Sequence, residues 1–225
     1  MSEPDSPDTP AESSSPRWRR RKQARPEELV AAAIELFVEQ GFAATNLKDV
    51  AKRAGVSKGT VYLYFKSKED LLLEAVRSSV VPIMDFVDDE ELASDEPASQ
   101  LLERLVRRWM EEFDARGVSG VPKLVMAEAG NFPGLAQQYV DLVVRRTRRL
   151  FSRVLKRGIE HGEFRPLDVG QAVQLLVAPL AYAHLHRHSL GPFDPGGLDQ
   201  DTYLDVHLDL FLRGVRAQPG ASDGD

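Results

Sequence analysis

A short polar run in the first third of the chain has the residue types needed to contact DNA; its members are Ser57, Lys58, Gly59 and Thr60. The major groove is about 12 Å wide, so a helix that enters it must keep its first turn slim. Lys58 can reach a phosphate or a guanine, Gly59 permits close backbone approach, and Thr60 offers a hydroxyl and a methyl group. Tyr62 and Tyr64 lie two positions apart, so we expect Tyr62 to face DNA and Tyr64 to face a flanking phosphate.

Two short predicted helices position this run. In the first, over residues 45–54, Thr45-Asn46 supplies the N-cap, and four apolar residues recur at helical spacing: Leu47, Val50, Ala51 and Ala54. Gly55 ends this helix, and Ser57 is a natural N-cap for the second, whose inward residues are Val61 and Phe65. Two short helices joined at a glycine turn form the helix-turn-helix pattern, in which the second helix enters the major groove.

A longer helix is predicted on each side of this pair. Residues 26–40 carry apolar side chains at helical spacing and end at Gly41, and residues 67–70 form a capping box ahead of a helix that reaches about Asp88. Two helices begin at Thr45 and at Lys68, and their N-terminal ends can hold phosphates on either side of the recognition helix. The expected DNA-binding residues are Thr45, Lys48, Ser57, Lys58, Gly59, Thr60, Tyr62, Tyr64 and Lys68.

This segment closely resembles the TetR family of regulators, on the residues GFAAT (41–45) and LKDVAKRAGVSKGTVYLYFKSKEDL (47–71). The likeness covers about residues 26–72, and the rest of the chain fits the family's C-terminal domain in helix number and length. It implies a homodimer, repression relieved by a small ligand, and DNA contacts at all the expected positions except Lys48. Leu63 departs from the polar or aromatic residue often found between the two tyrosines, and residues 123–133 look like a common C-terminal variant of the family.

Charge is unevenly distributed along the chain. Residues 17–70 carry twelve Lys and Arg against seven Asp and Glu, whereas residues 71–225 carry seventeen against twenty-four. A basic head on an acidic body is typical of a DNA-binding protein. Residues 17–25 form a basic arm that either contacts phosphates and the minor groove or is a solvated charge run. Residues 1–16 and 217–225 are polar tails that we expect to be disordered.

Every segment beyond Leu71 favours helix over strand, so an all-α fold is predicted. We expect a helix-turn-helix DNA-binding domain at 26–70 and a ligand-binding and dimerisation domain at 71–216. Helices are expected in the segment after Pro97 and over residues 121–129, 133–161, 167–189 and 198–216. The last two are long, apolar and joined by a short connection, so two copies could pack as a four-helix bundle around a two-fold axis.

An aromatic and methionine-rich set on the helices between positions 98 and 161 is soft enough to line an adaptable pocket. Residues of these types also fill cores, so packing is the competing interpretation for each of them. The expected ligand-binding residues are Trp109, Met110, Phe113, Met126, Phe132 and Tyr139.

Two other groups of side chains admit a binding role. His184 and His188 share a helix face and could bind a metal, but no Glu or Cys joins them at ligand spacing, so packing or interface roles are preferred for them and for His186. Four arginines could meet an anionic effector, although such runs usually form a solvated helix face; they are Arg145, Arg146, Arg148 and Arg149.

The composition limits the possible functions. The chain has no cysteine, which excludes disulfides and thiolate chemistry. It has no phosphate loop, Gly-x-Ser-x-Gly or His-Glu-x-x-His, so no catalytic residue, metal or cofactor is expected. It also lacks a long apolar span and a signal peptide, which favours a cytoplasmic protein. The predicted function is a dimeric, ligand-responsive repressor of an operator; the alternative is a helical adaptor for other proteins, which would not require residues 57–60 on an exposed turn.

Overall fold

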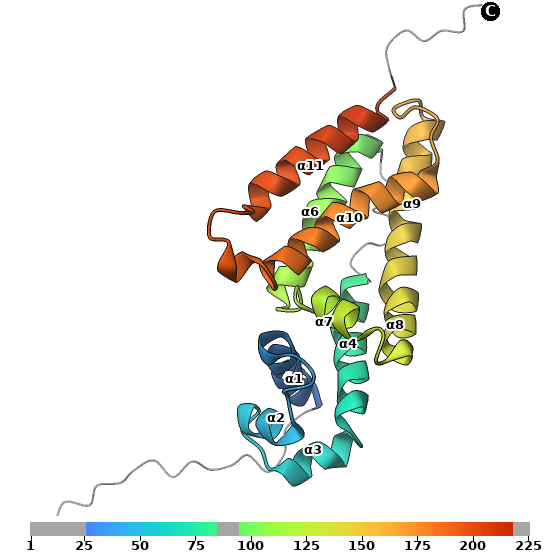
Figure 1. Cartoon of the computed structure of the whole chain (residues 1–225). Helices are drawn as coiled ribbons and strands as arrows, with labels where there is room; N and C mark the ends of the chain where they lie inside the picture. Colours follow the sequence, from blue (N-terminus) through green and yellow to red (C-terminus); the bar gives the residue numbers. More distant parts are fainter. Residues whose placement is uncertain (1–25, 85–94, 218–225) are drawn as a thin grey trace, which may run out of the picture.

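A computed structural model of the chain describes residues 26–84 and 95–217, which form helices joined by turns (Figure 1). The expected basic arm, the two expected tails except Ala217, and the expected continuation of a helix to Asp88 lie outside the described residues. Within the described ranges, β-type pairing is limited to an isolated bridge between Phe164 and Arg216. The predicted all-α fold is confirmed.

The N-terminal head consists of three helices, α1 (Pro26–Gln40), α2 (Leu47–Arg53) and α3 (Lys58–Tyr64). Asn46 is the N-cap of α2, because its side chain accepts hydrogen bonds from the backbone of Lys48 and Asp49. The turn before α3 needs Gly55, whose φ of 71° lies in the left-handed region that other residues rarely adopt.

Helix α4 (Lys68–Met84) connects the head to the rest of the molecule. It starts beside α3 and runs upward into the body in Figure 1, packing against α1 on the head side and against α6 and α8 on the body side. Helix α4 therefore contacts both the head and the body.

The body consists of α6 (Ala98–Ala115), α7 (Val121–Glu128), α8 (Pro133–Tyr139), the π-helical segment η1 (Val140–Val144), α9 (Arg145–Glu160), α10 (Val169–Arg187), the short 3-10 turn η2 (Gly191–Phe193) and α11 (Gln200–Val215). Asp168 and Asp199 cap α10 and α11 by accepting backbone hydrogen bonds. The single helix expected over 133–161 is helical almost throughout, but it contains the π-helical segment, which apolar periodicity does not predict.

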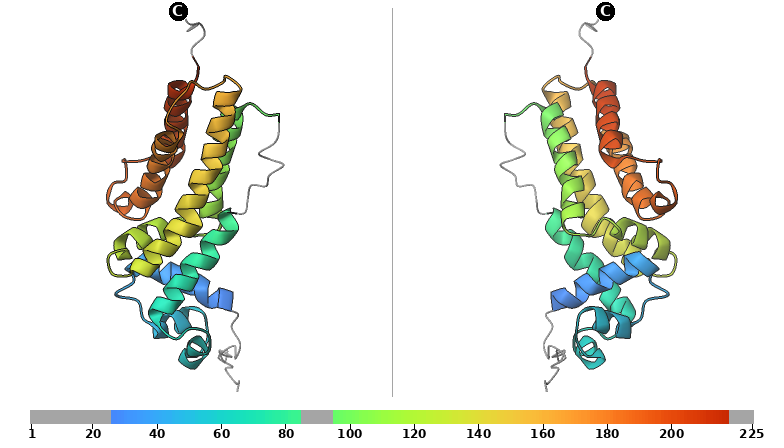
Figure 2. Two further views of the ribbon diagram at one scale, coloured as in Figure 1. Left: turned by 90° about the vertical axis from the view of Figure 1, so that its right-hand side faces the viewer. Right: turned by 90° about the vertical axis from the view of Figure 1, so that its left-hand side faces the viewer.

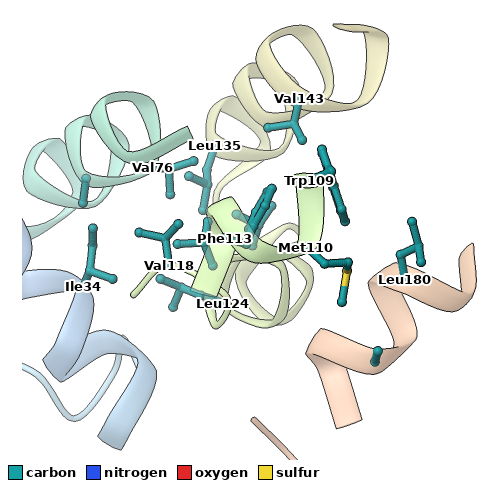
Figure 3. Close-up of a cluster of buried hydrophobic side chains, with 14 of the residues drawn as sticks. Ile34, Val76, Trp109, Met110, Phe113, Val118, Leu124, Leu135, Val143 and Leu180 are labelled. Carbon is teal, nitrogen blue, oxygen red and sulfur yellow. The ribbon is translucent and has the colours of Figure 1, made fainter. Parts of the chain in front are cut away.

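The body has two layers (Figure 2). Helix α9 packs between α6 and α10, and α11 packs on α10 at the outside of the molecule. The buried side chains of head and body form one continuous apolar core. Figure 3 shows the part of this core where α4, α6, α7 and α10 approach one another, with Phe113 at its centre.

Candidate nucleic-acid interface

Helix α3 lies at one end of the molecule (Figure 1). It exposes three consecutive large side chains. Tyr62 is 49% exposed, Leu63 is 81% exposed and Tyr64 is 44% exposed. The other side of the helix is held in the core by Val61 and Phe65, which are buried as the spacing predicts. Large apolar and aromatic surface on a short, rigid helix is a surface built to contact another molecule.

A hollow of about 600 Å³ lies beside this row, and four lysines line it, Lys48, Lys58, Lys66 and Lys68. The first three of these side chains are exposed, and Lys58 Nζ lies 5.5 Å from the ring centroid of Tyr62. A concave surface with several cations and an adjacent aromatic ring suits a phosphate backbone.

The start of α3 is fixed by its own hydroxyl groups. Ser57 Oγ accepts a hydrogen bond from the backbone N–H of Thr60 at 3.1 Å and lies 2.9 Å from Thr60 Oγ1. The Thr60 side chain is buried, so its hydroxyl belongs to the cap and not to the outer surface. The Thr60 hydroxyl, from which a DNA contact is expected, thus lies in the helix cap, whereas Ser57, Lys58 and Gly59 are exposed.

Thr45 is also placed differently from the expectation. Its side chain is buried, its hydroxyl lies 2.8 Å from the carbonyl oxygen of Gly41, and it accepts a hydrogen bond from Gln40 Nε2. The hydroxyl thus holds the loop between α1 and α2. The capping role assigned to the Thr45-Asn46 pair belongs to the Asn46 side chain.

Lys68 ties the first turn of α4 to the head. Its Nζ donates a hydrogen bond to the carbonyl oxygen of Phe42 at 2.7 Å and lies 4.2 Å from the centroid of the Phe42 ring. The expected phosphate contact of this ammonium group would compete with both interactions. The structure thus gives Lys68 an internal role that its position in the sequence does not reveal.

Arg53 joins α2 to α1 rather than facing outward with the lysines. Its guanidinium donates hydrogen bonds to Glu35 and Glu39 at 2.9 and 2.8 Å. The hydrogen bond from Arg53 lowers the pKa of Glu39, and the same bonds raise the pKa of Arg53. This cation is therefore neutralised within the head.

The six expected ligand-binding residues do not gather in one place. Trp109, Met110 and Phe113 are buried together on α6, as Figure 3 shows, and the rings of Trp109 and Phe113 lie 4.6 Å apart. Met126 is 54% exposed on α7. Phe132 lies at the junction with the head, where its ring centroid is 4.8 Å from that of Phe42.

Tyr139, the last of the six, is partly buried at the end of α8, and burial raises its pKa. The structure therefore keeps Trp109, Met110 and Phe113 as a common group, exposes Met126 and places Phe132 against Phe42.

The three histidines near the end of α10 have separate surroundings. His184 is fully buried against the rings of Trp109 and Phe113, with centroids 5.8 and 5.3 Å away. His188 bonds Ser119 at 2.9 Å, and His186 Nε2 lies 3.9 Å from Asp194. No three metal-ligating side chains of the described residues share a site.

Helices α10 and α11 carry large apolar side chains that the rest of the described chain does not cover. Leu175 and Tyr182 on α10, and Val206 and Leu210 on α11, are exposed, with 68% for Leu175 and 65% for Leu210. The two helices pack side by side at the edge of the body (Figure 2). Together these four residues define the α10–α11 outer face.

Family models match most of the described chain. The model for bacterial regulatory proteins of the tetR family matches residues 29–75, and the model for the tetracyclin repressor-like C-terminal domain matches residues 99–205. The transcriptional repressor KstR2 of Rhodococcus jostii is 30% identical over 207 residues, which cover 86% of this chain and 92% of the relative. The chain belongs to the TetR family.

Two further comparisons agree with this assignment, one in sequence and one in fold. KstR2 of Mycolicibacterium smegmatis is 29% identical over 218 residues, covering 95% of this chain and 97% of the relative. The crystal structure of FadR from Bacillus subtilis in complex with stearoyl-CoA superposes with a TM-score of 0.64 at 21% identity, covering 85% of this chain and all of that one. As a TetR-family member, the protein is a DNA-binding transcriptional regulator and not an enzyme.

For this TetR-family head, the reasoning from sequence missed Lys66. Lys66 follows Tyr62 by four positions, a spacing at which α-helical residues share a face, and this was the available signal. It was hidden because Lys66 lies just beyond the end of α3.

In the described ranges, no helix is both long enough and apolar enough to cross a membrane.

Proposed function

We propose that the protein is a homodimeric repressor that binds a near-palindromic operator through α3 and is released by a small molecule bound in its body. The observation that carries the DNA-binding part is the exposed row on α3 beside the lysine-lined hollow. Repression is supported by the KstR2 relatives, which are named transcriptional repressors.

The proposed DNA contacts fall into two groups. Ser57, Gly59 and Tyr62 face the bases, together with the exposed methyl groups of Leu63, which suit the thymine methyl. The contacts with the DNA phosphate backbone come from the lysine-lined hollow and the end of α3. They are made by Lys48, Lys58, Lys66 and Tyr64. Thr45, Thr60 and Lys68 contribute by fixing the position of α3. Any DNA contact from these three residues is made by the protein main chain and not by their side chains.

The α10–α11 outer face is the proposed dimer interface. A two-fold axis beside it pairs two copies as a four-helix bundle and buries Leu175, Tyr182, Val206 and Leu210 of each. Burial of these side chains removes apolar surface from water, which stabilises association. Two α3 helices held in this way would enter successive major grooves about 34 Å apart.

Signal transfer is proposed to pass through the junction of Phe42, Phe132 and Lys68. Phe42 belongs to the head, Phe132 to the turn before α8, and Lys68 to the first turn of α4. A ligand that favours one arrangement of the body shifts α4 and this junction together. Its differential affinity for the two arrangements sets the response, and a hundredfold difference corresponds to about 2.7 kcal/mol.

The test is selection of duplexes from a random DNA pool by the full-length protein at moderate salt. We expect enrichment of a sequence with two-fold symmetry, bound by two copies of the chain. Absence of any enriched sequence would contradict the proposal and favour a helical adaptor. Enrichment of an asymmetric site bound by a single copy would contradict the dimeric arrangement.

A further inference from the structure

The body core contains polar atoms that no hydrogen bond satisfies. Trp109 Nε1, His184 Nδ1 and His184 Nε2 are buried and have no hydrogen-bond partner among the described residues. More than nine in ten buried polar groups in folded proteins have a partner, so three orphaned nitrogen atoms in two adjoining side chains are unusual.

The neighbouring polar groups do not meet this need, because they bond one another. Asp114 is bound by Arg187 at 2.7 Å, and the His188 ring is bound by Ser119 at 2.9 Å. Lys123 donates to the carbonyl oxygen of His188. None of these hydrogen bonds includes His184, whose ring lies against the rings of Trp109 and Phe113.

We infer that Trp109 and His184 form the polar anchor of the effector site, and that the effector is an uncharged, largely apolar molecule with a hydroxyl or carbonyl oxygen. This inference rests on the proposed function, because it assigns a chemical class to the effector of that regulator. The indole N–H can only donate, so the ligand must supply an acceptor to Trp109.

The chemistry of His184 sets the second requirement. Burial lowers the pKa of His184 to about 4, so at neutral pH its ring has one donor and one acceptor nitrogen. A hydroxyl oxygen can accept from Trp109 and donate to His184, and a carbonyl oxygen can accept from both N–H groups. A charged head group would have to leave water for an apolar core, which opposes its binding.

The experiment uses the full chain with Trp18→Phe, so that Trp109 is the remaining tryptophan and reports on its own surroundings. The probes are benzyl alcohol and ethylbenzene, which have the same shape and differ in a hydroxyl for a methyl group. We expect benzyl alcohol to bind about tenfold more tightly and to shift the Trp109 emission to longer wavelength.

Two variants at position 184 separate this role from simple packing. His184→Phe should abolish the preference for the alcohol and raise the melting temperature of the free protein, because it replaces two unpaired nitrogen atoms by carbon. His184→Gln retains a donor and an acceptor and should keep the preference. Equal affinity for the two probes, no change in emission with either, or an unchanged preference in His184→Phe would each overturn the inference.

The same samples are also tested for dimerisation and for binding to the selected operator. Operator binding without any preference for the alcohol would contradict the proposed role of Trp109 and His184 in effector binding, but not the proposed function. An alcohol preference in a protein that selects no operator would overturn the proposed function and leave the anchor standing.

Discussion

The surface around α3 and the core around His184 treat their polar groups in opposite ways. In the head, the hydroxyls of Thr45, Ser57 and Thr60 and the ammonium group of Lys68 are bonded internally. In the body, Trp109 and His184 leave three buried nitrogen atoms unpaired. A satisfied scaffold needs no partner to hold its shape, whereas an unsatisfied one gains most from a ligand. The head is thus preorganised for DNA, and the body has the unsatisfied polar groups that the proposed effector would bond.

The largest effect is expected at the α10–α11 outer face, the proposed dimer interface. Leu175→Asp should yield monomers, because pairing of α10 and α11 would bury an unpaired carboxylate at a cost of more than about 4 kcal/mol, or about a thousandfold in dissociation constant. Sedimentation equilibrium measures this. Met126→Asp, the same kind of apolar-to-acidic change at an exposed position of α7, should remain dimeric. A dimeric Leu175→Asp protein would place the interface elsewhere.

The second effect concerns the unsatisfied core and its dependence on pH. The pKa of His184 falls from 6.5 to about 4 on burial, so the unfolded chain binds a proton that the folded chain does not. Above pH 6.5 the neutral His184 ring leaves the free energy of unfolding unchanged by pH. As the pH falls toward 4, proton uptake by the unfolded chain lowers the free energy of unfolding by up to about 3 kcal/mol. Asp114 on α6 opposes this shift, whereas Arg187 and His188 on α10 add to it.

Urea unfolding between pH 7 and 4 measures this loss, with His184→Phe as the reference. Burial also lowers the pKa of His188 and His207. These two histidines therefore lower the free energy of unfolding at acidic pH in both proteins. The difference between the two proteins isolates His184. Parallel curves would show that His184 is not neutral in the folded protein.

In the head, Tyr62→Ala should weaken operator binding by about 2 kcal/mol, or roughly thirtyfold, without unfolding the protein. The reason is that the Tyr62 ring is half exposed on α3 and is not part of the core. A gel-shift titration measures the affinity, and circular dichroism checks the fold. Unchanged affinity would remove α3 from the recognition surface.

Lys58→Ala should reduce the slope of log affinity against log salt by about two, since one phosphate contact is lost from each of the two protomers on the operator. The control is Lys156→Ala on α9, an exposed lysine in the body, away from α3 (Figure 1). Titrations at several salt concentrations separate the two variants. An equal change in both slopes would mean that the lysine-lined hollow has no special role.

The smallest effect is expected where the two regions meet. The rings of Phe42 and Phe132 are nearly perpendicular, with an angle of 73° between them, an arrangement worth about 1 kcal/mol beyond burial. A double-mutant cycle of Phe42→Leu and Phe132→Leu should recover this coupling in urea unfolding. Strict additivity would show that head and body are not coupled through this pair.

Local chemistry made much of the head predictable from sequence. The Ser57 cap, the Gly55 turn and the inward pair Val61 and Phe65 depend on residues within a few positions of one another, and the structure has all of them. The internal role of Lys68 was not predictable, because its partner, the carbonyl oxygen of Phe42, lies 26 residues earlier in the chain. The Thr45 hydroxyl bonds the nearby carbonyl oxygen of Gly41, but its sequence position does not show that packing buries it. An exposed hydroxyl and a buried one look alike in a sequence.

The body was predictable in its helices but less so in its contacts. The residue types of Trp109, Met110 and Phe113 fit both a core and a pocket, and only the packing shows that His184 joins them. Phe132 has the same composition signal, yet the chain turn before α8 carries it to the head. The unpaired nitrogen atoms arise from what surrounds the side chains, which no spacing rule encodes.

The π-helical segment η1 determines which way the two halves of the long helix face. At about 100° per residue, an uninterrupted α-helix would turn the buried Leu135 of α8 and the buried Phe151 of α9 about 160° apart, on opposite sides. One residue absorbed by the wider π turn reduces this angle to about 60°. Deletion of a single residue within Val140–Val144 would therefore close the π turn and leave α8 and α9 facing as they do, whereas closing η1 into a regular α-helix at full length would rotate α8, with its contact to α4, away from the side that α9 buries against α6.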